Sequence, residues 1–592
     1  MTRTRSIAAR ITLALALLVD SPGAAPTASG RGPAGQAAPE LFRDFDVVIA
    51  GGSTAAFAAA VASAESGART ALIEPTDWVG GQITASAVPA IDEAWHKVTD
   101  RRTGEVYNVS AIARKRENMT PNFRAMLDAI GNPGGGWVSN YCFQPKDFLD
   151  EHLVLAEALL GEKLVVFRES VIKSVDADPA TGRIRSVTAI RRRPRPGVAR
   201  MGYDRPLSAD LADWYSPAAS DRFDKSVLTF AAGDRPGRPT IFLDATEWGE
   251  VLVLADAPYL QGVEAADGGR EGDDSCGQAT VFDIVERINA GPREEPPGPE
   301  GVENLGFGNY KDKPDAWERI WTYRRLKGRG SKPAVGDISL QNWGYSGRDN
   351  EGGNDYPFGY LFRPKATAAA ERADWRGGVD LDVLAAAERR AIAWHYWFKA
   401  HAPKPFVPGQ VTLDRGVLGT GTGLAKMPYI RDTRRSIGLD GFILTAADLG
   451  GEPSNRTGKR FRDRVALGAY PADIHPMVRC TFPPYISRSH DTLPFCIPFR
   501  ALTSERYGNL LVAGKTMAQS FLANAATRLH PIEWSSGTAA GVAAAAMSRN
   551  AWTSRDALNR IGELQALIRE KTPIDWTIDG EVYPRPGEKT EF

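Results

Sequence analysis

The chain has 592 residues, too many for one simple core, so two or more substructures sharing a large interior are expected. Hydrophobic residues make up 43% and charged residues 24%, a balance that is typical of globular proteins and excludes a disordered or fibrous chain. Lys plus Arg and Asp plus Glu both number 72, so the net charge is zero and nucleic acid is not expected as a partner.

Residues 1–25 are predicted to be a signal peptide. Three arginines among the first ten residues precede an apolar run at 11–19, which is too short to cross a bilayer but typical of a signal-peptide core. Residues 26–42 are predicted to be a flexible lead-in, and no later stretch is apolar enough for a transmembrane helix. We therefore expect export to the periplasm or the outside of the cell. A disordered tail on a cytoplasmic protein is the alternative.

The clearest pattern in the chain runs from 44 to 74, where strand, glycine turn, helix and strand follow one another. A short buried strand is predicted at 47–49, an alanine-rich helix at 54–66 and a second strand at 70–73. This order is the beginning of a dinucleotide-binding βαβ unit.

The turn of this unit matches the dinucleotide fingerprint only in part. The three glycine positions hold Gly51, Ser53 and Ala56. Ala56 is an accepted substitute, whereas Ser53 adds a side chain where the phosphates must come close. The context supports the match, because the turn opens a helix N-terminus and Glu74 follows about 20 residues on to accept the ribose hydroxyls.

The rest of the chain alternates between strand and helix signals. A helix is predicted at 147–160, and strands at 164–167, 171–175 and 240–243. The basic stretch from 183 to 205 is interpreted as a solvated hairpin or insertion.

The middle of the chain, about 258–440, is rich in Gly, Pro and aromatic residues. Within it a helix is predicted at 381–400, capped by Asp380, whose tryptophans are expected in the core. A strand at 509–514 and a small-residue helix at 538–547 follow near the end.

The four cysteines have no spacing typical of a metal site. They are far apart in the sequence, so a structural zinc site is not expected and no metal is predicted. Two disulfides would suit an exported protein, but free buried thiols are an equal alternative in a chain of this size. No pairing is assigned.

Four later motifs carry a resemblance to a known family. They are FLDATEWGE at 242–250, PYIRDTRRSIG at 428–438, GAYPADIH at 468–475, and the long small-residue segment at 509–546. With the turn at 44–74, they make the chain similar to the broad, mostly uncharacterised bacterial group of FAD-dependent oxidoreductases. The similarity covers most of the chain, but Glu247 stands where that group usually has glycine.

The resemblance implies an α/β fold with a Rossmann-type, glutathione-reductase-like FAD-binding domain and an interleaved α+β substrate domain. The FAD domain would comprise 43–257 and, after a substrate or cap region at 258–500, the return at 501–592. FAD is the expected cofactor, the other partners being a small organic substrate and an unidentified electron acceptor.

The cofactor-binding residues expected from the turn and from the resemblance lie in six parts of the chain. They are Gly51, Gly52, Ser53, Thr54, Ala55, Ala56, Glu74, Pro75, Gly80, Gly81, Gln82, Val171, Asp244, Ala245, Thr246, Gly514, Lys515, Gly537, Thr538 and Ala539.

The last of these segments has a physical rationale. Reduction of the flavin ring places negative charge on its N1 and O2 side, and a helix N-terminus directed there stabilises that charge. Gly537 is expected to open such a helix, with Gly537 and Thr538 nearest the ring. A small-residue helix that packs tightly against a sheet is the alternative.

Candidate reacting residues are histidines and arginines of the second half. His530, His475 and His490 could each move a proton beside the flavin, and His530 ranks first because it lies between two FAD-like stretches. Arginines could clamp a carboxylate or polarise a carbonyl. The arginine candidates are Arg528, Arg431, Arg434 and Arg435, and at least two of them are expected to form structural ion pairs.

Two other classes of function stay open as alternatives. A hydrolase or lyase has little support, because the sequence contains no GxSxG elbow and no HExxH helix. A secreted carbohydrate-binding protein would use the tryptophan-rich middle of the chain, which holds many of its 14 tryptophans, and would keep the nucleotide fold as a relic.

Overall fold

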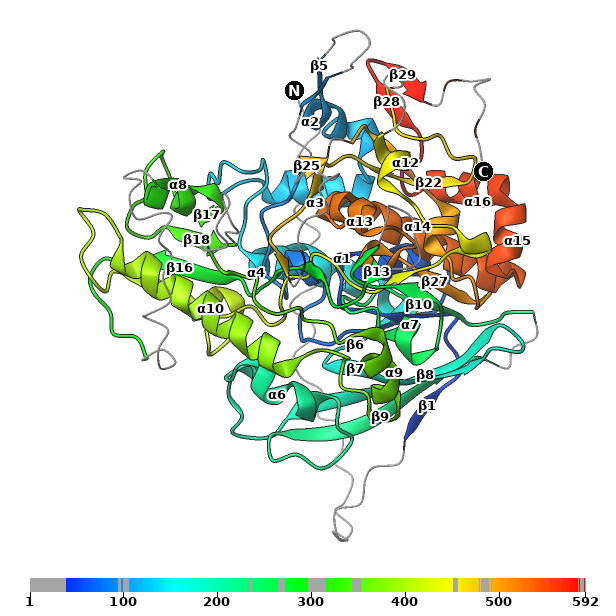
Figure 1. The fold of residues 1–592 in the computed structure, drawn as a ribbon, viewed down its shortest axis with the longest axis horizontal. Coiled ribbons are helices and arrows are strands. Elements are labelled where there is room, and N and C mark those ends of the chain that lie inside the picture. Colours follow the sequence, from blue (N-terminus) through cyan, green and yellow to red (C-terminus); the bar gives the residue numbers. More distant parts are fainter. Residues whose placement is uncertain are drawn as a thin grey trace, which may run out of the picture. The chain divides into compact units, whose positions relative to one another are not determined.

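The computed structural model of the protein describes most of the chain (Figure 1). The described residues are 39–93, 97–99, 106–233, 237–264, 272–296, 316–342, 353–450, 456–478, 480, 489–490, 492–583, 585 and 590. The predicted signal peptide and nearly all of the lead-in lie outside them. No helix in these ranges is both long and apolar enough to cross a membrane.

A parallel sheet of five strands holds the predicted βαβ unit. Its order is β27-β10-β2-β3-β6, and every neighbouring pair is parallel. The strands are β2 (Val47–Ala50), β3 (Thr70–Ile73), β6 (Leu164–Phe167), β10 (Ile241–Asp244) and β27 (Leu510–Val512). With α1 (Thr54–Glu65) between β2 and β3, the prediction for this part of the chain is confirmed. β27 lies beside β10 although more than 260 residues separate them.

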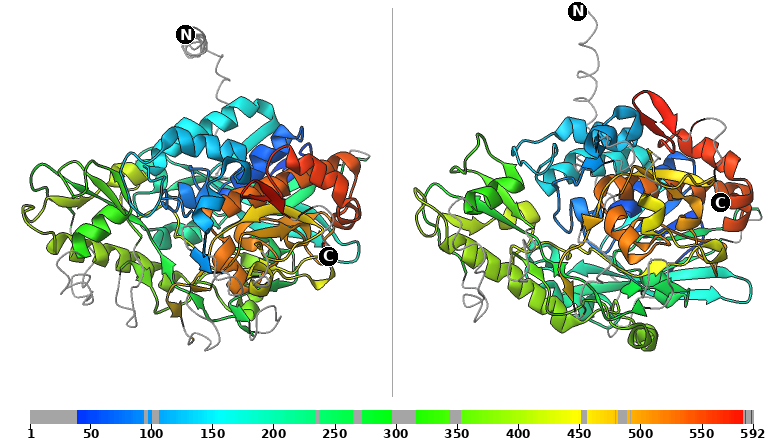
Figure 2. Two further views of the ribbon diagram at one scale, coloured as in Figure 1. Left: turned by 90° about the horizontal axis from the view of Figure 1, so that it is seen from above. Right: turned by 45° about the horizontal axis from the view of Figure 1, so that its top comes forward.

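Two small-residue helices pack against each other on this sheet (Figure 2). α14 (His530–Asn550) lies so close to α1 that a Cβ added at Gly537 would be 2.2 Å from the Ala55 carbonyl oxygen. A Cβ at Gly541 would be equally close to the Ala59 oxygen. The prediction that Gly537 opens the last helix is therefore wrong, because α14 begins seven residues earlier and its glycines serve helix packing.

A second sheet explains the basic stretch at 183–205. Its order is β1-β9-β8-β7, with β1 (Glu40–Phe42), β7 (Ser170–Asp178), β8 (Arg183–Pro194) and β9 (Phe223–Ala231). β8 pairs antiparallel with both β7 and β9. Arg191 pairs with Glu40 of β1 and Arg195 with Asp224 of β9, so acidic residues of this sheet neutralise part of the positive charge. The stretch forms one arm of a hairpin, as interpreted, but it is not solvated throughout, because Arg192 is 1% exposed.

The middle of the chain forms smaller sheets beside the long helix α10 (Leu381–Ala400). Asp380 caps this helix by accepting hydrogen bonds from the N–H groups of Asp382 and Val383, as predicted. Trp394 is fully buried and stacks on Trp397 at 4.9 Å, so the core interpretation of the aromatic side is confirmed. A four-stranded sheet that contacts α10 consists of β16 (Ile284–Ile288), β17 (Arg325–Lys327), β18 (Ile338–Gln341) and β20 (Val411–Leu413).

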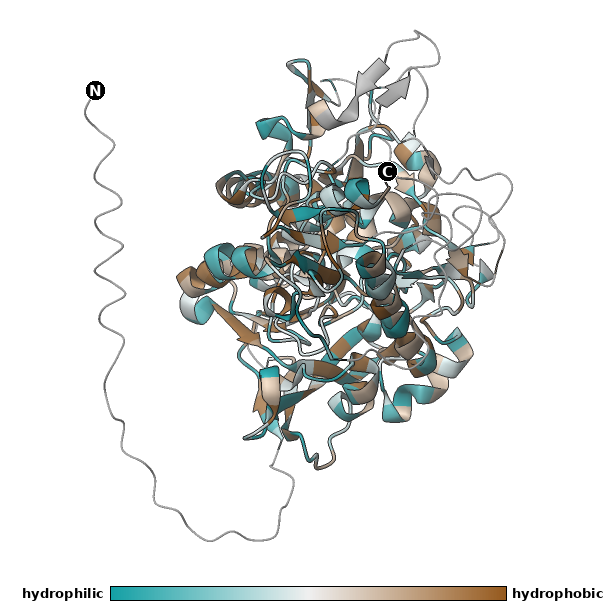
Figure 3. Cartoon of the chain, turned by 90° about the vertical axis from the view of Figure 1, so that its left-hand side faces the viewer, coloured by the Kyte–Doolittle hydropathy of each residue, from teal (hydrophilic) through white to brown (hydrophobic). Residues whose placement is uncertain are grey.

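The remaining longer helices include α13 (Phe521–Thr527), which is buried along its whole length. The others have exposed residues and are α3 (Pro121–Ile130), α5 (Val154–Leu160), α6 (Leu207–Trp214), α8 (Ala316–Tyr323), α9 (Lys365–Glu371), α15 (Ser554–Asn559) and α16 (Ile561–Arg569). Figure 3 shows hydrophilic and hydrophobic residues alternating along helices at the surface.

One disulfide is present among the four cysteines. Cys276 is bonded to Cys480, while Cys142 and Cys496 are free and buried. Burial raises the pKa of both free thiols to about 12, so they stay protonated at neutral pH. The disulfide joins segments 204 residues apart, beside the paired strands β14 (Gly277–Gln278) and β24 (Met477–Val478).

Loss of this disulfide is expected to destabilise the protein by about 2–4 kcal/mol, because the bond closes a very long loop in the unfolded chain. The double variant Cys276→Ser, Cys480→Ser should therefore melt at a lower temperature than the wild type. Thiol titration of the denatured, unreduced wild type should find two free thiols, and four after reduction. Four thiols before reduction would contradict the bond.

Candidate active site

The dinucleotide turn lies at the carboxyl end of β2, and its backbone demands glycine. A Cβ at Gly51 would be 2.7 Å from the Ile73 carbonyl oxygen, to which the Gly51 N–H donates a hydrogen bond of 2.8 Å. Gly52 has a φ of +112°, which disfavours residues with side chains. Both glycines are therefore required by the local geometry.

Ser53 departs from the fingerprint without filling the phosphate position. Its Oγ donates to the Ala245 carbonyl oxygen at 2.6 Å and accepts from the Ala56 N–H at 3.1 Å. The side chain thus caps α1 and fastens it to the end of β10. The first N–H groups of α1, which have no partner within the helix, keep their suitability for an anion.

The segment after β3 packs directly on this turn. Thr54 Oγ1 donates to the Gly80 carbonyl oxygen at 2.7 Å, and a Cβ at Gly81 would be 2.5 Å from Ser53 Cα. The next residue, Gln82, donates from Nε2 to the Arg528 carbonyl oxygen, while its buried Oε1 has no hydrogen-bond partner in the part of the chain that the structure describes. The Gly80–Gly81 turn therefore joins the dinucleotide turn to the beginning of α14.

Glu74 ends β3 at the same edge of the sheet and is 1% exposed. Its Oε1 accepts from the N–H and the hydroxyl of Thr76, both at 3.2 Å. Burial raises the pKa of this carboxyl to about 8. Beside it, Ser170 donates its N–H to the Glu74 carbonyl oxygen, and Val171 of β7 is buried.

This raised pKa makes stability depend on pH in protein freed of flavin. Folded Glu74 keeps its proton up to about pH 8, whereas in the unfolded chain the carboxyl has its ordinary pKa of 4.5, so its contribution to stability falls as pH rises between these values. Glu74→Gln is expected to flatten the decline of the melting temperature from pH 5 to pH 9. The surface variant Glu563→Gln is the control, and equal slopes for wild type and Glu74→Gln would contradict the assignment.

The segment that follows β10 is held by its own side chains. Asp244 accepts from the N–H and hydroxyl of Thr246 and from the N–H of Leu252, which fixes the turn into α7 (Glu250–Leu254). The residue with left-handed backbone in this segment is Gly249, with a φ of +61°, and not Glu247. A side chain at 247 is therefore compatible with the turn.

A buried cluster of opposite charges lies at the carboxyl ends of β10 and β27. The Lys515 ammonium is 2.9 Å from Glu247 and 2.7 Å from Glu533, and all three side chains are at most 5% exposed. Burial raises the pKa of Glu247 to about 7, and the two carboxylates hold the pKa of Lys515 above its ordinary value although burial opposes this. The cluster joins the carboxyl ends of β10 and of the edge strand β27 to the first turn of α14.

His530, the first-ranked proton carrier, has both ring nitrogens engaged by the backbone. Nε2 is 2.8 Å from the Val88 carbonyl oxygen, and Nδ1 accepts from the Asp92 N–H at 3.1 Å. Burial lowers the pKa of this imidazole to about 4, so the ring is neutral and Nε2 is the donor. This geometry supports a role in fixing the 88–92 segment and not in proton transfer.

His475 and Arg528 belong to one polar cluster. His475 lies between two carboxylates, with Nδ1 2.8 Å from Asp355 and Nε2 3.4 Å from Asp473. Arg528 donates to the Asp473 carbonyl oxygen at 3.1 Å and to the Tyr429 hydroxyl at 2.6 Å. Both ring nitrogens of His475 therefore have a partner, as both ring nitrogens of His530 do. The side chain of His490 is outside the described residues.

The other candidate arginines differ in their surroundings. Arg431 forms an ion pair of 2.7 Å with Asp355 and lies 5.3 Å from the Tyr429 ring. Arg434 donates to three carbonyl oxygens and a glutamine, and Arg435 pairs with Glu264. Arg431 and Arg435 thus form buried ion pairs, as expected for at least two of the four, whereas Arg434 is held by neutral partners.

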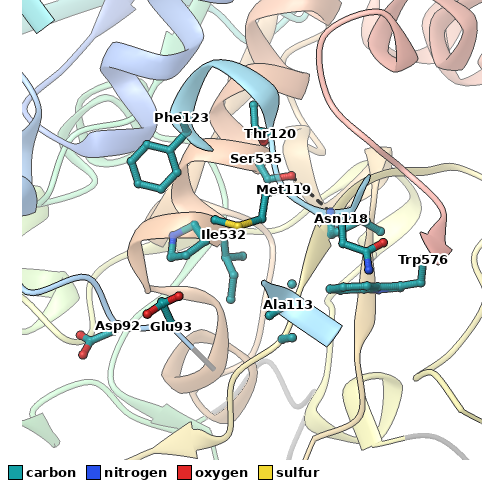
Figure 4. A pocket seen from close by; sticks show the side chains of 14 residues that line it. Asp92, Glu93, Ala113, Asn118, Met119, Thr120, Phe123, Ile532, Ser535 and Trp576 are labelled. Carbon is teal, nitrogen blue, oxygen red and sulfur yellow. Dashed lines mark hydrogen bonds between the residues drawn. The ribbon is translucent and has the colours of Figure 1, made fainter. Parts of the chain in front are cut away.

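A cavity adjoins the first turns of α14 (Figure 4). Asp92 and Glu93 lie side by side at one end of it, and the sulfur-bearing side chain of Met119 lies near its middle. Asp92 is held in place by two contacts, since its Oδ1 is 3.7 Å from Arg324 and its N–H donates to His530 Nδ1. Apolar and acidic surfaces therefore meet beside this helix terminus.

The structure brings most of the expected cofactor residues to one edge of the central sheet. Gly514 belongs with them, since a Cβ there would be 2.8 Å from Ala55 Cβ. Gly537, Thr538 and Ala539 lie in later turns of α14. Tyr429 and Glu533 were not predicted, although Tyr429 lies within the motif at 428–438 and Glu533 within that at 509–546. Their contacts with Arg528 and Lys515, which the sequence does not show, identify these two residues as candidates.

Comparison with family models decides the classification. The model described as FAD dependent oxidoreductase matches residues 46–201 and 217–568, which is most of the chain. The chain belongs to this family. It is thus an FAD-dependent oxidoreductase, and its fold and cofactor agree with the predictions. A comparison with curated proteins gives no significant match.

Solved structures that resemble this family member are distant. The Sdh1 complex of Mycobacterium smegmatis in the apo form shares 11% identity over 89% of this chain and 72% of that chain, with a TM-score of 0.30. A geranylgeranyl bacteriochlorophyll reductase-like protein of Thermoplasma acidophilum shares 9% identity over 90% and 85% of the two chains, with a TM-score of 0.27. The classification depends on the family model and not on these likenesses.

The described residues fit FAD. The α1 N-terminus and the glycine turns leave backbone N–H groups for the diphosphate, and Glu74 lies at the end of β3, where a ribose binds in this fold. The buried Gln82 Oε1 lacks a donor, which the bound cofactor can supply. Bound FAD supplies the chemistry of hydride acceptance and donation.

Proposed function

We propose that this oxidoreductase moves hydride between FAD and an organic substrate bound beside Tyr429 and Arg528. The observation that carries the proposal is the convergence of the dinucleotide turn, the Gly80–Gly81 turn and the beginning of α14 at the carboxyl edge of the sheet. Ligands of open α/β sheets bind at this edge. The cavity at Asp92 adjoins the same helix terminus, because Pro531, Ile532 and Ser535 of the first turns of α14 line it.

Tyr429 is our candidate for the proton that accompanies the hydride. Its hydroxyl oxygen accepts from Arg528 at 2.6 Å, and within the described ranges no acceptor for its proton is found. Burial raises the pKa of Tyr429, so the phenol holds its proton at neutral pH. Arg528 and Lys515 flank the ring at 5.8 and 5.7 Å and would stabilise the phenolate once the proton has left.

This role favours substrates that carry oxygen or nitrogen on the carbon that exchanges hydride, such as alcohols, 2-hydroxy acids and amines. When a carbonyl is reduced, the hydride forms the new C–H bond and the Tyr429 proton forms the new O–H bond. When an alcohol is oxidised, the C–H and O–H bonds break: the hydride would pass to FAD and the proton to Tyr429, which must then be present as the phenolate that Arg528 and Lys515 stabilise.

The experiment is a spectrum of the purified protein, followed by anaerobic mixing with a panel of alcohols, 2-hydroxy acids, amines and amino acids. We expect flavin absorbance near 450 nm and its loss with at least one member of the panel. Protein that stays colourless after incubation with excess FAD would overturn the proposal.

The carbohydrate-binding alternative gains no support from the tryptophans. Trp321, Trp375, Trp394 and Trp534 are among the largest fully buried side chains, so they serve the core and offer no face to a sugar. We do not propose this function.

We also propose that the protein is exported. The disulfide between Cys276 and Cys480 supports this, because such bonds persist in oxidising compartments. Cell fractionation with N-terminal sequencing of the native protein tests the proposal, and a mature protein that keeps residue 1 in the cytoplasm would contradict it.

A further inference from the structure

Three acid and base residues meet at the cofactor edge of the sheet. Glu247 follows β10, Lys515 follows β27, and Glu533 lies in the first turn of α14. The sequence separates Glu247 from the other two by 268 and 286 positions, yet the Lys515 ammonium bridges both carboxylates within 2.9 Å. A buried ion cluster is costly to desolvate and adds little net stability, so its position beside the cofactor edge invites a functional explanation.

The carboxyl group of Glu533 is incompletely bonded. Its Oε1 accepts from Lys515 at 2.7 Å, whereas Oε2 has no hydrogen-bond partner among the described residues although the side chain is fully buried. A buried carboxylate oxygen without a donor costs free energy, which a bound ligand can recover.

Glu533 lies directly beside the dinucleotide turn. Its carboxyl carbon is 3.5 Å from the position that a Cβ on Gly514 would take, and Ala55 Cβ is 2.8 Å from that same point. On the other side of the cluster, Lys515 is 5.7 Å from the Tyr429 ring. The cluster therefore lies between the first turn of α1 and Tyr429, where the substrate is proposed to react.

The charges of the cluster indicate which kind of ligand group can bond to the free oxygen of Glu533. One ammonium stands against two carboxyl groups, so the cluster has no surplus positive charge to offer a phosphate. A hydroxyl donor suits the free oxygen. In FAD, the chain between the diphosphate and the flavin ring is ribityl, which carries three hydroxyl groups.

We propose that Glu533 Oε2 accepts a hydrogen bond from a ribityl hydroxyl of FAD, with Lys515 and Glu247 holding the carboxylate in place. Glu533 then makes the site selective for flavin nucleotides over adenine nucleotides that lack ribityl. The inference rests on the proposed function, because it requires FAD to bind at the carboxyl edge of the central sheet.

The test compares FAD with ADP, which shares the adenosine diphosphate half and lacks ribityl. Binding is measured by titration calorimetry on the full chain freed of flavin. In Glu533→Gln the dissociation constant for FAD is expected to rise at least tenfold, and that for ADP to change less than threefold. The exposed variant Glu563→Gln is the matched control and should leave both constants unchanged.

Several outcomes would overturn the inference. A rise of both dissociation constants by the same factor would show that Glu533 only supports the fold at this edge of the sheet. No change in either constant would show that Glu533 Oε2 makes no contact with the cofactor. Should Glu533→Gln fail to fold, FAD analogues that lack the 2′, 3′ or 4′ ribityl hydroxyl are titrated into the wild type. One of them is expected to bind at least tenfold more weakly, and equal affinity of all three with FAD would exclude the contact. If the wild type binds no FAD at all, the proposed function itself fails.

Discussion

Gly537→Ala is expected to destabilise the protein by about 3 kcal/mol, although alanine is the better helix former. A Cβ at this position would lie 2.2 Å from the Ala55 carbonyl oxygen, which belongs to the backbone of α1 and cannot move aside as a side chain does. The two helices must separate, and the dinucleotide turn at the beginning of α1 must move with them. The melting temperature should fall, and FAD affinity should weaken as a consequence.

The same substitution elsewhere provides the control. Gly562 lies on the exposed side of α16, where a Cβ would meet no atom within 4 Å. Gly562→Ala should therefore be neutral or stabilise by up to about 1 kcal/mol. If Gly537→Ala melts like the wild type and loses FAD affinity alone, the glycine serves the flavin ring, as the sequence pattern first indicated.

Tyr429→Phe is expected to slow the reduction of the flavin by substrate about 10²–10⁴-fold, the usual contribution of a positioned proton donor or acceptor. The variant keeps the ring and removes only the hydroxyl that Arg528 holds. Flavin content and substrate affinity should change little, so the loss should appear in the rate at saturating substrate. Stopped-flow absorbance at 450 nm, with the panel member that reduces the wild type fastest, measures this rate as a function of pH.

Tyr396 provides the control for the loss of a tyrosine hydroxyl. Tyr396 lies on α10 and its hydroxyl makes only a long contact of 3.5 Å with the Pro296 carbonyl oxygen at the surface. Tyr396→Phe should reduce its flavin at the wild-type rate. His530→Gln should lower thermal stability more than the rate, because His530 bonds the backbone at Val88 and Asp92. A large loss of rate in His530→Gln, with none in Tyr429→Phe, would reverse the two assignments.

The sequence by itself determined the local elements and the class of protein. The βαβ unit at 44–74 and the helix at 381–400 follow from apolar periodicity, glycine turns and a capping residue, all of which act over a few neighbouring positions. The motifs spread along the chain indicated the FAD-dependent oxidoreductase family, which the family model confirms. Short-range physics and motif order suffice for these results.

Only the tertiary structure decided what each candidate side chain contacts. Whether His530 has a free nitrogen depends on Val88 and Asp92, which lie more than 430 residues away in sequence. The pairing of Cys276 with Cys480, the packing role of Gly537 and the cluster around Lys515 likewise join segments far apart in sequence. No local pattern encodes such partners, because burial and hydrogen bonding are set by which distant strands and helices meet when the chain folds.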